Sequence, residues 1–367
     1  MSLRDRWRAF RNSCLLSSRF QRWSAGFPLT RPVALSSARA LFDLTAGFVY
    51  TQILFSCVKL GLFEALRDGP LSEAEIAARL DLPEDSARRL ARAAGTLRLT
   101  ERFSDGRWGL GDLGAAMLGA PGVKEMVEHH AALYADLADP VALLRERGGR
   151  IGEFWAYSRN AAAGEMTPEK VADYSALMAA SQATFVEDVI GAHPFARHRR
   201  LLDIGGGEGQ FIRAVARVAP KLELGVFDLP GVAELARRRF AEDGLDSRAE
   251  AFGGDFFADP FPQGADLVSL IRVCFDHDDA PALKLLTRIR EIVPPDGALL
   301  VAETMAGTPG AEPVGDAYFG FYLLAMGSGR PRTAEELSAL LSKAGFSRIR
   351  EARTTRPMLV RVLVARP

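Results

Sequence analysis

Carboxylates and glycines stand at the ends of three short apolar segments in the second half of the chain. Asp203 precedes a run of four glycines within residues 205–209, and Asp228 ends the next apolar segment. Gly254-Asp255-Phe256 follows the third segment. Glycines between a strand and a helix let a ligand approach the backbone, and the helix start offers free N–H groups. A carboxylate at the end of the next strand can accept both hydroxyls of a ribose. This spacing predicts a nucleoside-binding site.

The charges at this site favour a cationic ligand over a diphosphate. Asp203 would place a negative charge beside phosphates, whereas the same carboxylate suits an amino group and a sulfonium. Asp255 and Phe256 offer an acceptor for an adenine amine and a ring for the adenine face. We therefore expect S-adenosyl-L-methionine as the cofactor. Its predicted contacts are Asp203, Gly205, Gly207, Asp228, Leu229, Gly254, Asp255, Phe256 and Arg272.

The elements that must position these residues alternate between strands and helices. After His198, short apolar segments alternate with helical ones, which indicates a doubly wound parallel sheet. The predicted strands are Leu201–Ile204, Glu223–Phe227, Ala265–Ile271 and Ala298–Glu303. Ile349–Ala352 and Leu359–Ala365 are expected to pair as an antiparallel edge. The predicted fold class is α/β, with a Rossmann-like doubly wound sheet in residues 198–367.

Residues 36–120 are predicted to form a mainly helical winged-helix domain used for packing or dimerisation. Ser72 and Glu75 form a capping-box pattern that opens one helix, and a second helix follows from Glu84. Thr100 to Leu110 has the pattern of a hairpin. The second helix is rich in arginine, as DNA-reading helices are, but Lys+Arg and Asp+Glu balance at 46 each. We therefore expect no nucleic-acid partner.

Residues 1–35 form a basic, aromatic N-terminal arm. Within the first 32 residues, seven arginines and five aromatic side chains accompany a single acid, Asp5. Cations mixed with aromatic rings suit a membrane interface. Packing on the body of the protein or on a second subunit is an alternative, and a transit peptide is another. Residues 121–197, between the winged helix and the sheet, are predicted to form a helical linker and part of the substrate pocket.

The sequence argues against a membrane-spanning protein, a disulfide-rich protein and a metalloprotein. Ala46–Leu66 contains Lys59 and Glu64, which predicts a buried helix and not a membrane span. Three widely spaced cysteines argue against a disulfide framework or a structural zinc site and favour a reducing cytosol. The acidic loop 276–279 does not by itself organise oxygen ligands around one cation, so we expect no metal.

These motifs resemble the S-adenosylmethionine-dependent O-methyltransferases that carry an N-terminal winged-helix dimerisation domain. The resemblance runs from about Leu41 to the end of the chain and rests on Asp203–Gly209, Phe227–Pro230, Gly254–Phe257 and Arg272–Asp279. Within that family the chain looks most like the hydroxyneurosporene (demethylspheroidene) O-methyltransferases of carotenoid synthesis in purple phototrophic bacteria. The features that suggest this group are the Arg-rich start, Glu128-His129-His130, Ala135–Leu144 and Gly327–Thr333.

The resemblance implies a homodimer that methylates the tertiary 1-hydroxyl of a hydroxycarotenoid, an apolar substrate. It implies a cytoplasmic enzyme, either free or peripheral on the cytoplasmic face of the photosynthetic membrane. An apolar substrate would need an apolar pocket. The predicted lining is Phe154, Trp155, Met178, Phe319, Phe321 and Tyr322. Aromatic residues at helical spacing can equally belong to a hydrophobic core.

The resemblance also reveals a gap in the catalytic machinery. Family members use a histidine base braced by two acids; the histidine position falls on Phe275, the first acid on Glu303 and the second on or beside Pro331. An alkanol is about as acidic as water, whose pKa is about 15.7, so proton removal should contribute to the rate. His277, expected to be a cation among neighbouring acids, is the first candidate base. His130 is the second, and the third possibility is no dedicated base.

The missing histidine leaves three other functions open. One is a carbon methyltransferase acting on a tetrapyrrole such as a bacteriochlorophyll precursor. Another is a family member that binds the cofactor without transferring its methyl group. The third is a winged-helix regulator that uses the cofactor domain as a sensor.

Overall fold

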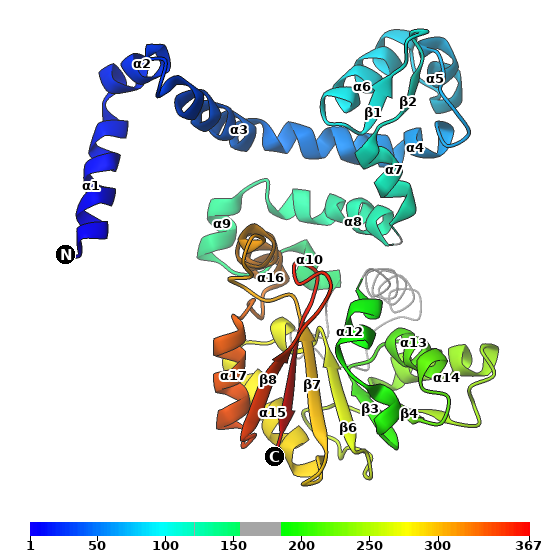
Figure 1. Cartoon of the computed structure of the whole chain (residues 1–367). Coiled ribbons are helices and arrows are strands. Elements are labelled where there is room, and N and C mark those ends of the chain that lie inside the picture. The colour runs from blue at the N-terminus through cyan, green and yellow to red at the C-terminus, as the bar shows by residue number, and fades with distance from the viewer. Residues whose placement is uncertain (121, 155–184) are drawn as a thin grey trace. The chain divides into compact units, whose positions relative to one another are not determined.

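The computed structural model describes residues 1–120, 122–154 and 185–367, which form two compact units. The first unit is Met1–Ala116 and the second is Met117–Pro367. Figure 1 shows the elements of each unit, which are described separately below.

The first unit contains the elements of a winged helix. After the short helix α4 (Leu62–Ala65) come α5 (Glu73–Leu80), α6 (Glu84–Thr96) and an antiparallel hairpin of β1 (Thr100–Arg102) and β2 (Trp108–Leu110). The predicted capping box is confirmed, because the Ser72 hydroxyl accepts the Glu75 N–H and the Glu75 carboxylate accepts the Ser72 N–H. Helix α7 (Asp112–Gly119) follows the hairpin.

Three helices precede the winged helix: α1 (Leu3–Leu16), α2 (Ser18–Gly26) and the 29-residue α3 (Arg31–Lys59). Counted over residues 1–120, α1 and α2 hold no buried residue, and α3 buries only Cys57 and Val58. The prediction of a buried helix over Ala46–Leu66 is therefore wrong for residues 46–56 in the single chain, whereas Leu62, Phe63 and Leu66 of that stretch are buried. Helix α3 packs on α2, α4 and α6. By length and composition alone, α3 could cross a membrane.

The second unit is built on a seven-stranded sheet in the order β5-β4-β3-β6-β7-β9-β8. Five strands are parallel: β3 (Arg200–Ile204), β4 (Glu223–Asp228), β5 (Ala249–Gly253), β6 (Leu267–Ile271) and β7 (Ala298–Glu303). β8 (Arg348–Ala352) and β9 (Arg361–Arg366) pair antiparallel, and β9 also pairs antiparallel with β7. The predicted α/β class and the antiparallel edge are confirmed. The strand order reverses between β3 and β6, where ligands bind in open sheets of this kind.

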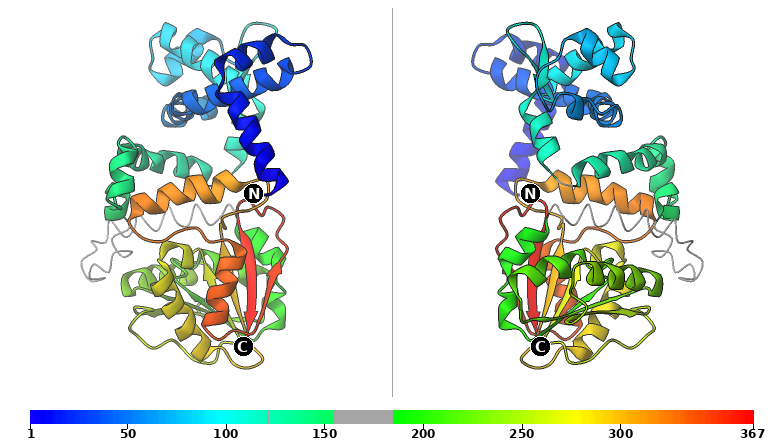
Figure 2. Two further views of the ribbon diagram at one scale, coloured as in Figure 1. Left: turned by 90° about the vertical axis from the view of Figure 1, so that its left-hand side faces the viewer. Right: turned by 90° about the vertical axis from the view of Figure 1, so that its right-hand side faces the viewer.

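Helices cover both faces of the sheet (Figures 1 and 2). One core includes side chains from α12 (Val186–Ala192), α13 (Gln210–Val218) and α14 (Pro230–Glu242). The other includes side chains from α15 (Asp279–Ile292) and α17 (Ala334–Lys343). Leu201 belongs to the first core and Leu202 to the second, because successive strand side chains point to opposite faces.

A third cluster lies among helices outside the two sheet faces. It joins residues of α8 (Val123–Asp136), α9 (Pro140–Arg145), α10 (Arg150–Phe154), the seven-residue π-helix η4 (Pro313–Phe319) and α16 (Gly320–Met326). Phe275, on the short 3₁₀ helix η3 (Cys274–Asp276) after β6, packs into this cluster. Figure 2 shows α8 and α16 side by side. The helical cluster therefore meets the carboxyl end of β6, beside the reversal of strand order.

Candidate active site

The glycine turn after β3 is shaped to admit a ligand. Gly205 and Gly207 have φ angles of 71° and 60°, which side-chain-bearing residues rarely adopt. A Cβ atom on Gly205 would lie 2.7 Å from Cγ2 of Val273, so the turn is closely packed on its inner side. A Cβ on Gly207 would meet no heavy atom of the described chain within 4 Å. The backbone at Gly207 is therefore open to a bound molecule.

Asp228, at the end of β4, is fixed beside this turn. Its Oδ2 accepts the N–H of Gly207 at 2.8 Å, and its Oδ1 accepts the N–H of Leu229 at 2.7 Å. The backbone carbonyl of Asp228 accepts the Gly254 N–H at 2.9 Å, which ties the end of β5 to the end of β4. Burial raises the pKa of Asp228 above its ordinary value despite these two bonds. The carboxylate is held in one orientation with lone pairs left to accept ligand hydroxyls.

Asp203 is fully buried at the end of β3 and has no cationic partner among the described residues. Its Oδ1 accepts the Ser269 hydroxyl at 2.6 Å, and its Oδ2 has no hydrogen-bond partner in the described residues. Burial, with the negative charge of Asp228 as a smaller cause, raises the pKa of Asp203 to about 7. A buried carboxyl with an unpaired oxygen, beside the half-buried carboxyl of Asp228, fits a cationic ligand such as S-adenosylmethionine and would oppose a diphosphate.

The loop after β5 supplies the predicted adenine contacts. Asp255 is half-buried, and its Oδ1 accepts the Phe257 N–H at 2.7 Å. The rings of Phe256 and Phe257 both pack edge-on against His277, with centroid separations of 5.6 and 5.2 Å. The structure thus brings His277 to the predicted adenine end of the site.

His277 is not the stabilised cation that its acidic neighbours suggested. Burial, with the charge of Arg332 as a smaller cause, lowers the pKa of His277 to about 4. Asp278 raises the pKa but does not offset these effects, because the ring is buried between Phe256 and Phe257. The imidazole is neutral at physiological pH, so the expectation of an imidazolium was wrong.

Arg272 adopts an unusual conformation at the end of β6. Its φ is 58°, and its guanidinium lies 5.2 to 5.4 Å from the ring centroids of Phe185, Phe275 and Phe319. Its Nε is buried without a hydrogen-bond partner in the described residues. A left-handed arginine at a strand end is a costly conformation that is characteristic of functional sites. The rings hold the cation by cation–π contacts at the edge of the helical cluster.

Glu303 lies on the neighbouring strand end and is buried. Its Oε1 accepts the Cys274 N–H at 2.9 Å, and its Oε2 has no hydrogen-bond partner in the described part of the chain. The position expected for the second bracing acid falls on or beside Pro331, and the neighbouring residue, Arg332, is a cation with a different role. It is buried and donates to the carbonyl oxygens of Cys274 and His277 at 2.8 and 2.7 Å, which fixes the turn that carries Phe275.

Two histidine–tyrosine pairs join α8 to the helices that follow β7. Nε2 of His130 lies 2.7 Å from the Tyr318 hydroxyl, and Nε2 of His129 lies 2.8 Å from the Tyr322 hydroxyl. Burial lowers the pKa of both histidines, that of His129 to about 4. His130 therefore reaches the cluster around Phe319 through Tyr318, which packs edge-on against that ring.

The structure gathers part of the predicted substrate pocket. Phe319 and Tyr322 are buried and pack in one cluster with Phe275. Phe321 does not join them and is 37% exposed. It lies two residues after Phe319, and a separation of two residues in a helix turns a side chain by about 200°, to the opposite side. Trp155 and Met178 lie outside the described residues, as does the side chain of Phe154.

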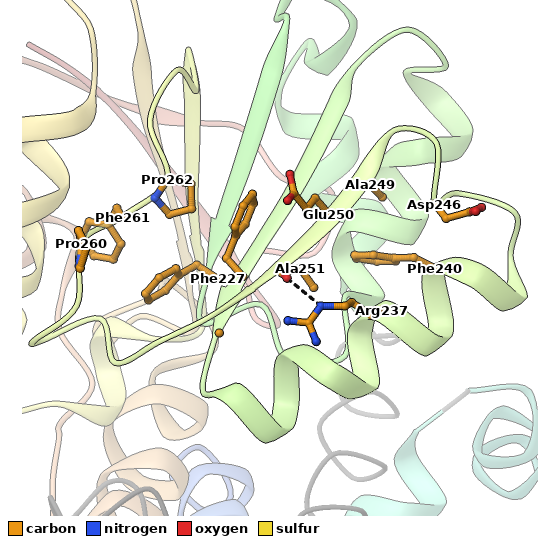
Figure 3. Close-up of a pocket in the computed structure, with 12 residues that line it drawn as sticks. Phe227, Arg237, Phe240, Asp246, Ala249, Glu250, Ala251, Pro260, Phe261 and Pro262 are labelled. Carbon is orange, nitrogen blue, oxygen red and sulfur yellow. Dashed lines mark hydrogen bonds between the residues drawn. The ribbon is translucent and has the colours of Figure 1, made fainter.

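An open groove of about 750 Å³ runs along the edge strand β5 (Figure 3). Phe227, Phe252 and Phe261 line it, together with Arg237 of α14. None of the predicted cofactor residues is among its lining residues in the described chain. The groove is therefore separate from the site at the strand ends.

The described residues also contain no group of three or more His, Cys, Asp and Glu side chains that could hold a metal ion.

Comparisons with known proteins agree with this geometry. Residues 134–347 match the model of the O-methyltransferase domain, and residues 42–119 match the O-methyltransferase dimerisation domain. The chain is 41% identical to the demethylspheroidene O-methyltransferase of Cereibacter sphaeroides over 350 residues, 95% of this chain and 92% of that protein. The corresponding protein of Rhodobacter capsulatus is 38% identical, over 95% of this chain and 87% of its own length.

Solved structures show the same architecture. Human N-acetylserotonin methyltransferase, solved in complex with S-adenosylmethionine, superposes with a TM-score of 0.74 at 25% identity, covering 90% of this chain and 97% of that one. The mitomycin 7-O-methyltransferase superposes with a TM-score of 0.75 at 26% identity, covering 92% and 100%.

The fold, shared with a methyltransferase solved with S-adenosylmethionine, places this chain among the S-adenosylmethionine-dependent methyltransferases. This chain belongs to the family of O-methyltransferases with an N-terminal dimerisation domain. It is an S-adenosylmethionine-dependent O-methyltransferase, and its dimerisation domain makes it a homodimer.

Sequence reasoning did not identify several residues that shape the site. Ser269 binds Asp203 from the middle of β6, and Phe185 places a ring on Arg272 from the start of α12. Ser269 lies within an otherwise apolar strand and Phe185 is an ordinary core residue type, so no local motif marks either as part of the site. Asp276 was considered as a neighbour of His277 and as part of the acidic loop weighed for metal binding, but not as a base, although it directly follows Phe275.

Loss of the Asp228 charge should weaken cofactor binding. We expect Asp228→Asn to reduce the affinity for S-adenosylhomocysteine by roughly 10- to 100-fold, because bonds to a charged acceptor are worth about 1.5–3 kcal/mol. Titration calorimetry measures the change. Asp243→Asn, which removes a carboxylate that pairs with Arg213, is the charge-matched control and should bind within two-fold of the unsubstituted protein. Equal affinities for the two variants would show that Asp228 does not contact the nucleoside.

Proposed function

We propose that this enzyme methylates the tertiary 1-hydroxyl of a hydroxycarotenoid in carotenoid biosynthesis. The observation that carries the proposal is the ring cluster of Phe275, Phe319 and Tyr322, which supplies apolar surface next to the strand ends where we propose that the cofactor binds. A polyene needs such apolar surface and few polar contacts. The 41% identity to a demethylspheroidene O-methyltransferase over 95% of the chain supports the same substrate class.

The proposed cofactor contacts follow from the site geometry. Asp228 would accept the ribose hydroxyls, Gly205 and Gly207 would pass beneath the ligand, and Asp203 would face its amino-acid end. Leu229, Gly254, Asp255 and Phe256 would enclose the adenine, and Arg272 would lie beneath the cofactor. When bound, S-adenosylmethionine supplies an electrophilic methyl group on a positively charged sulfur.

We further propose that the enzyme is cytoplasmic and peripheral on the membrane that stores its substrate. Leu3, Trp7, Phe10 and Cys14 recur at helical spacing on α1, so they share one face, and Trp7 and Phe10 are 62% and 59% exposed. Arginines flank this face and suit anionic headgroups, at about 1 kcal/mol each near the surface.

The exposed apolar part of α3 has a different proposed partner. Leu41, Phe42, Leu44 and Phe48 are all exposed in the single chain. Phe42, Leu44 and Phe48 lie at the start of the segment that matches the dimerisation domain, residues 42–119, and Leu41 directly precedes it. We propose that the second copy of the chain covers them, since the dimer must bury apolar surface from this region.

Methyl transfer to a carotenoid is tested with radiolabelled cofactor. Purified enzyme, S-adenosylmethionine labelled in its methyl group and a hydroxycarotenoid should yield a labelled 1-methoxy carotenoid. A carotenoid without the hydroxyl is the control and should stay unlabelled. Label that enters only tetrapyrroles of a pigment extract would favour the carbon methyltransferase, and no transfer to either pigment would contradict both assignments.

Membrane binding by the arm is tested with substitutions on its apolar face. We expect Trp7→Glu to lower the fraction of enzyme that sediments with phosphatidylglycerol vesicles at least five-fold, because the ring no longer inserts at the interface. Asn12→Glu makes the same charge change on the opposite face of α1 and should lower it less than two-fold. If both variants sediment like the unsubstituted enzyme, the arm packs on protein and not on lipid.

A further inference from the structure

The place where the family carries its histidine base is apolar in this protein. The Phe275 ring is buried and packs edge-on against Phe319 at a centroid separation of 5.8 Å. The other two candidate histidines are committed elsewhere, because His277 packs between two rings and His130 pairs with the Tyr318 hydroxyl. A hydroxyl substrate nevertheless needs a proton acceptor during methyl transfer.

Two acidic residues neighbour Phe275 along the chain and across the sheet. Asp276 directly follows Phe275 on η3 and is half-buried, and Glu303 lies on the end of β7, the strand beside β6. The two carboxyls interact electrostatically with each other, and each interacts with Arg272. Arg272, Asp276 and Glu303 therefore form one charged cluster at the ends of two adjacent strands.

Two atoms of this cluster are buried without partners. Oε2 of Glu303 and Nε of Arg272 have no hydrogen bond within the described residues. An unpaired buried donor or acceptor costs about 1–3 kcal/mol, and more when it is charged. Such atoms are rare in native proteins and need an explanation, which a polar group of a bound ligand provides.

We propose that Asp276 is the general base of this enzyme and replaces the missing histidine, with Glu303 as its positioning partner. The inference rests on the proposed function and deepens it by naming the group that receives the substrate proton. Glu303 is held by the Cys274 N–H at 2.9 Å, and Arg332 fixes the same turn through the Cys274 carbonyl. The acceptor thus stands on a turn that is fixed from two sides.

Proton affinities near neutrality support this role. Burial raises the pKa of Asp276 to about 7, and burial with the charge of Asp276 raises the pKa of Glu303 to about 8. Arg272 lowers both values, Arg332 lowers that of Glu303, and the Cys274 thiol and the Tyr318 phenol near the cluster are neutral because burial raises their pKa. Near pH 7.5 the pair carries roughly one proton and one negative charge, which is the state a base requires.

The reaction at this cluster conserves atoms and charge. The hydroxyl oxygen of the substrate bonds to the methyl carbon while the carbon–sulfur bond breaks and its electron pair remains on sulfur. The hydroxyl proton passes to the Asp276 carboxylate, which then releases it to water. The positive charge of Arg272 favours the ionised carboxylate and offsets part of the effect of burial on the pKa of Asp276.

Asp276→Asn separates this role from a structural one. We expect the variant to lose at least 100-fold in kcat, to bind S-adenosylhomocysteine within two-fold of the unsubstituted enzyme, and to lose the rise of kcat between pH 6 and 8. Its Tm at pH 8 should be equal or higher, because a buried carboxyl with a raised pKa destabilises the folded state once it ionises. Asp278→Asn, at an exposed neighbouring residue, is the control and should keep its rate within two-fold.

Rescue tests the same point independently. The double variant with Phe275→His and Asp276→Asn should have a kcat at least ten-fold higher than that of Asp276→Asn alone. The reason is that Phe275→His returns an imidazole to the position of the family's base. A loss of less than five-fold in Asp276→Asn, or a pH profile that the substitution leaves unchanged, overturns the proposal. A 100-fold loss in His130→Ala with Asp276→Asn unaffected assigns the base to His130 instead.

Failure of the base assignment is distinguishable from failure of the proposed function. If the unsubstituted enzyme does not methylate the hydroxycarotenoid, the substrate proposal fails. The same variants are then compared on the acceptor that the enzyme labels in a pigment extract, and the ratio of their rates still decides the role of Asp276.

Discussion

Burial of acidic side chains at the carboxyl end of the sheet is the constraint on which the site depends. Asp203, Asp228, Asp276 and Glu303 all have pKa values raised by burial. For Asp203 the rise from an ordinary value of 3.8 to about 7 corresponds to about 4 kcal/mol against the ionised form. Such a group is either protonated or neutralised by a cation. A sulfonium nucleoside supplies that cation, so the fold and its ligand are electrostatically complementary.

The fold creates this situation through its strand order. Because β3 and β6 are neighbours at the reversal point, their ends bring Asp203, the glycine turn and Arg272 to one edge. The helical cluster meets the same edge through Phe275, which replaces a polar base with an apolar ring. We interpret the replacement as an adaptation to an apolar acceptor, in which apolar surface extends up to the reacting hydroxyl and the acidic function moves to the adjacent residue.

Sequence patterns predicted the fold class and the identity of the cofactor, because both depend on local signals. The glycine run, the strand-end acids and the Ser72–Glu75 capping box each follow from residue types at fixed spacings. The unburied state of α3 was not predictable, since an apolar helix has the same pattern whether its cover is its own chain or a second one. The importance of Asp276 and Arg272 for the site could not be predicted either. The burial of Asp276, the φ of 58° at Arg272 and the rings around its guanidinium are tertiary properties.

The central claim is that cofactor binding places positive charge beside carboxyls that are partly protonated. Titration calorimetry with S-adenosylmethionine at pH 6.5, in phosphate and in imidazole buffer, measures the protons exchanged on binding. The account predicts net proton release, because the cation lowers the pKa of these carboxyls, and a smaller release with S-adenosylhomocysteine, which lacks the sulfonium charge. The ionisation enthalpies of the two buffers differ, so equal heats of binding, after subtraction of the heats of dilution, would mean that no proton is exchanged. That result, or net proton uptake, would contradict the account.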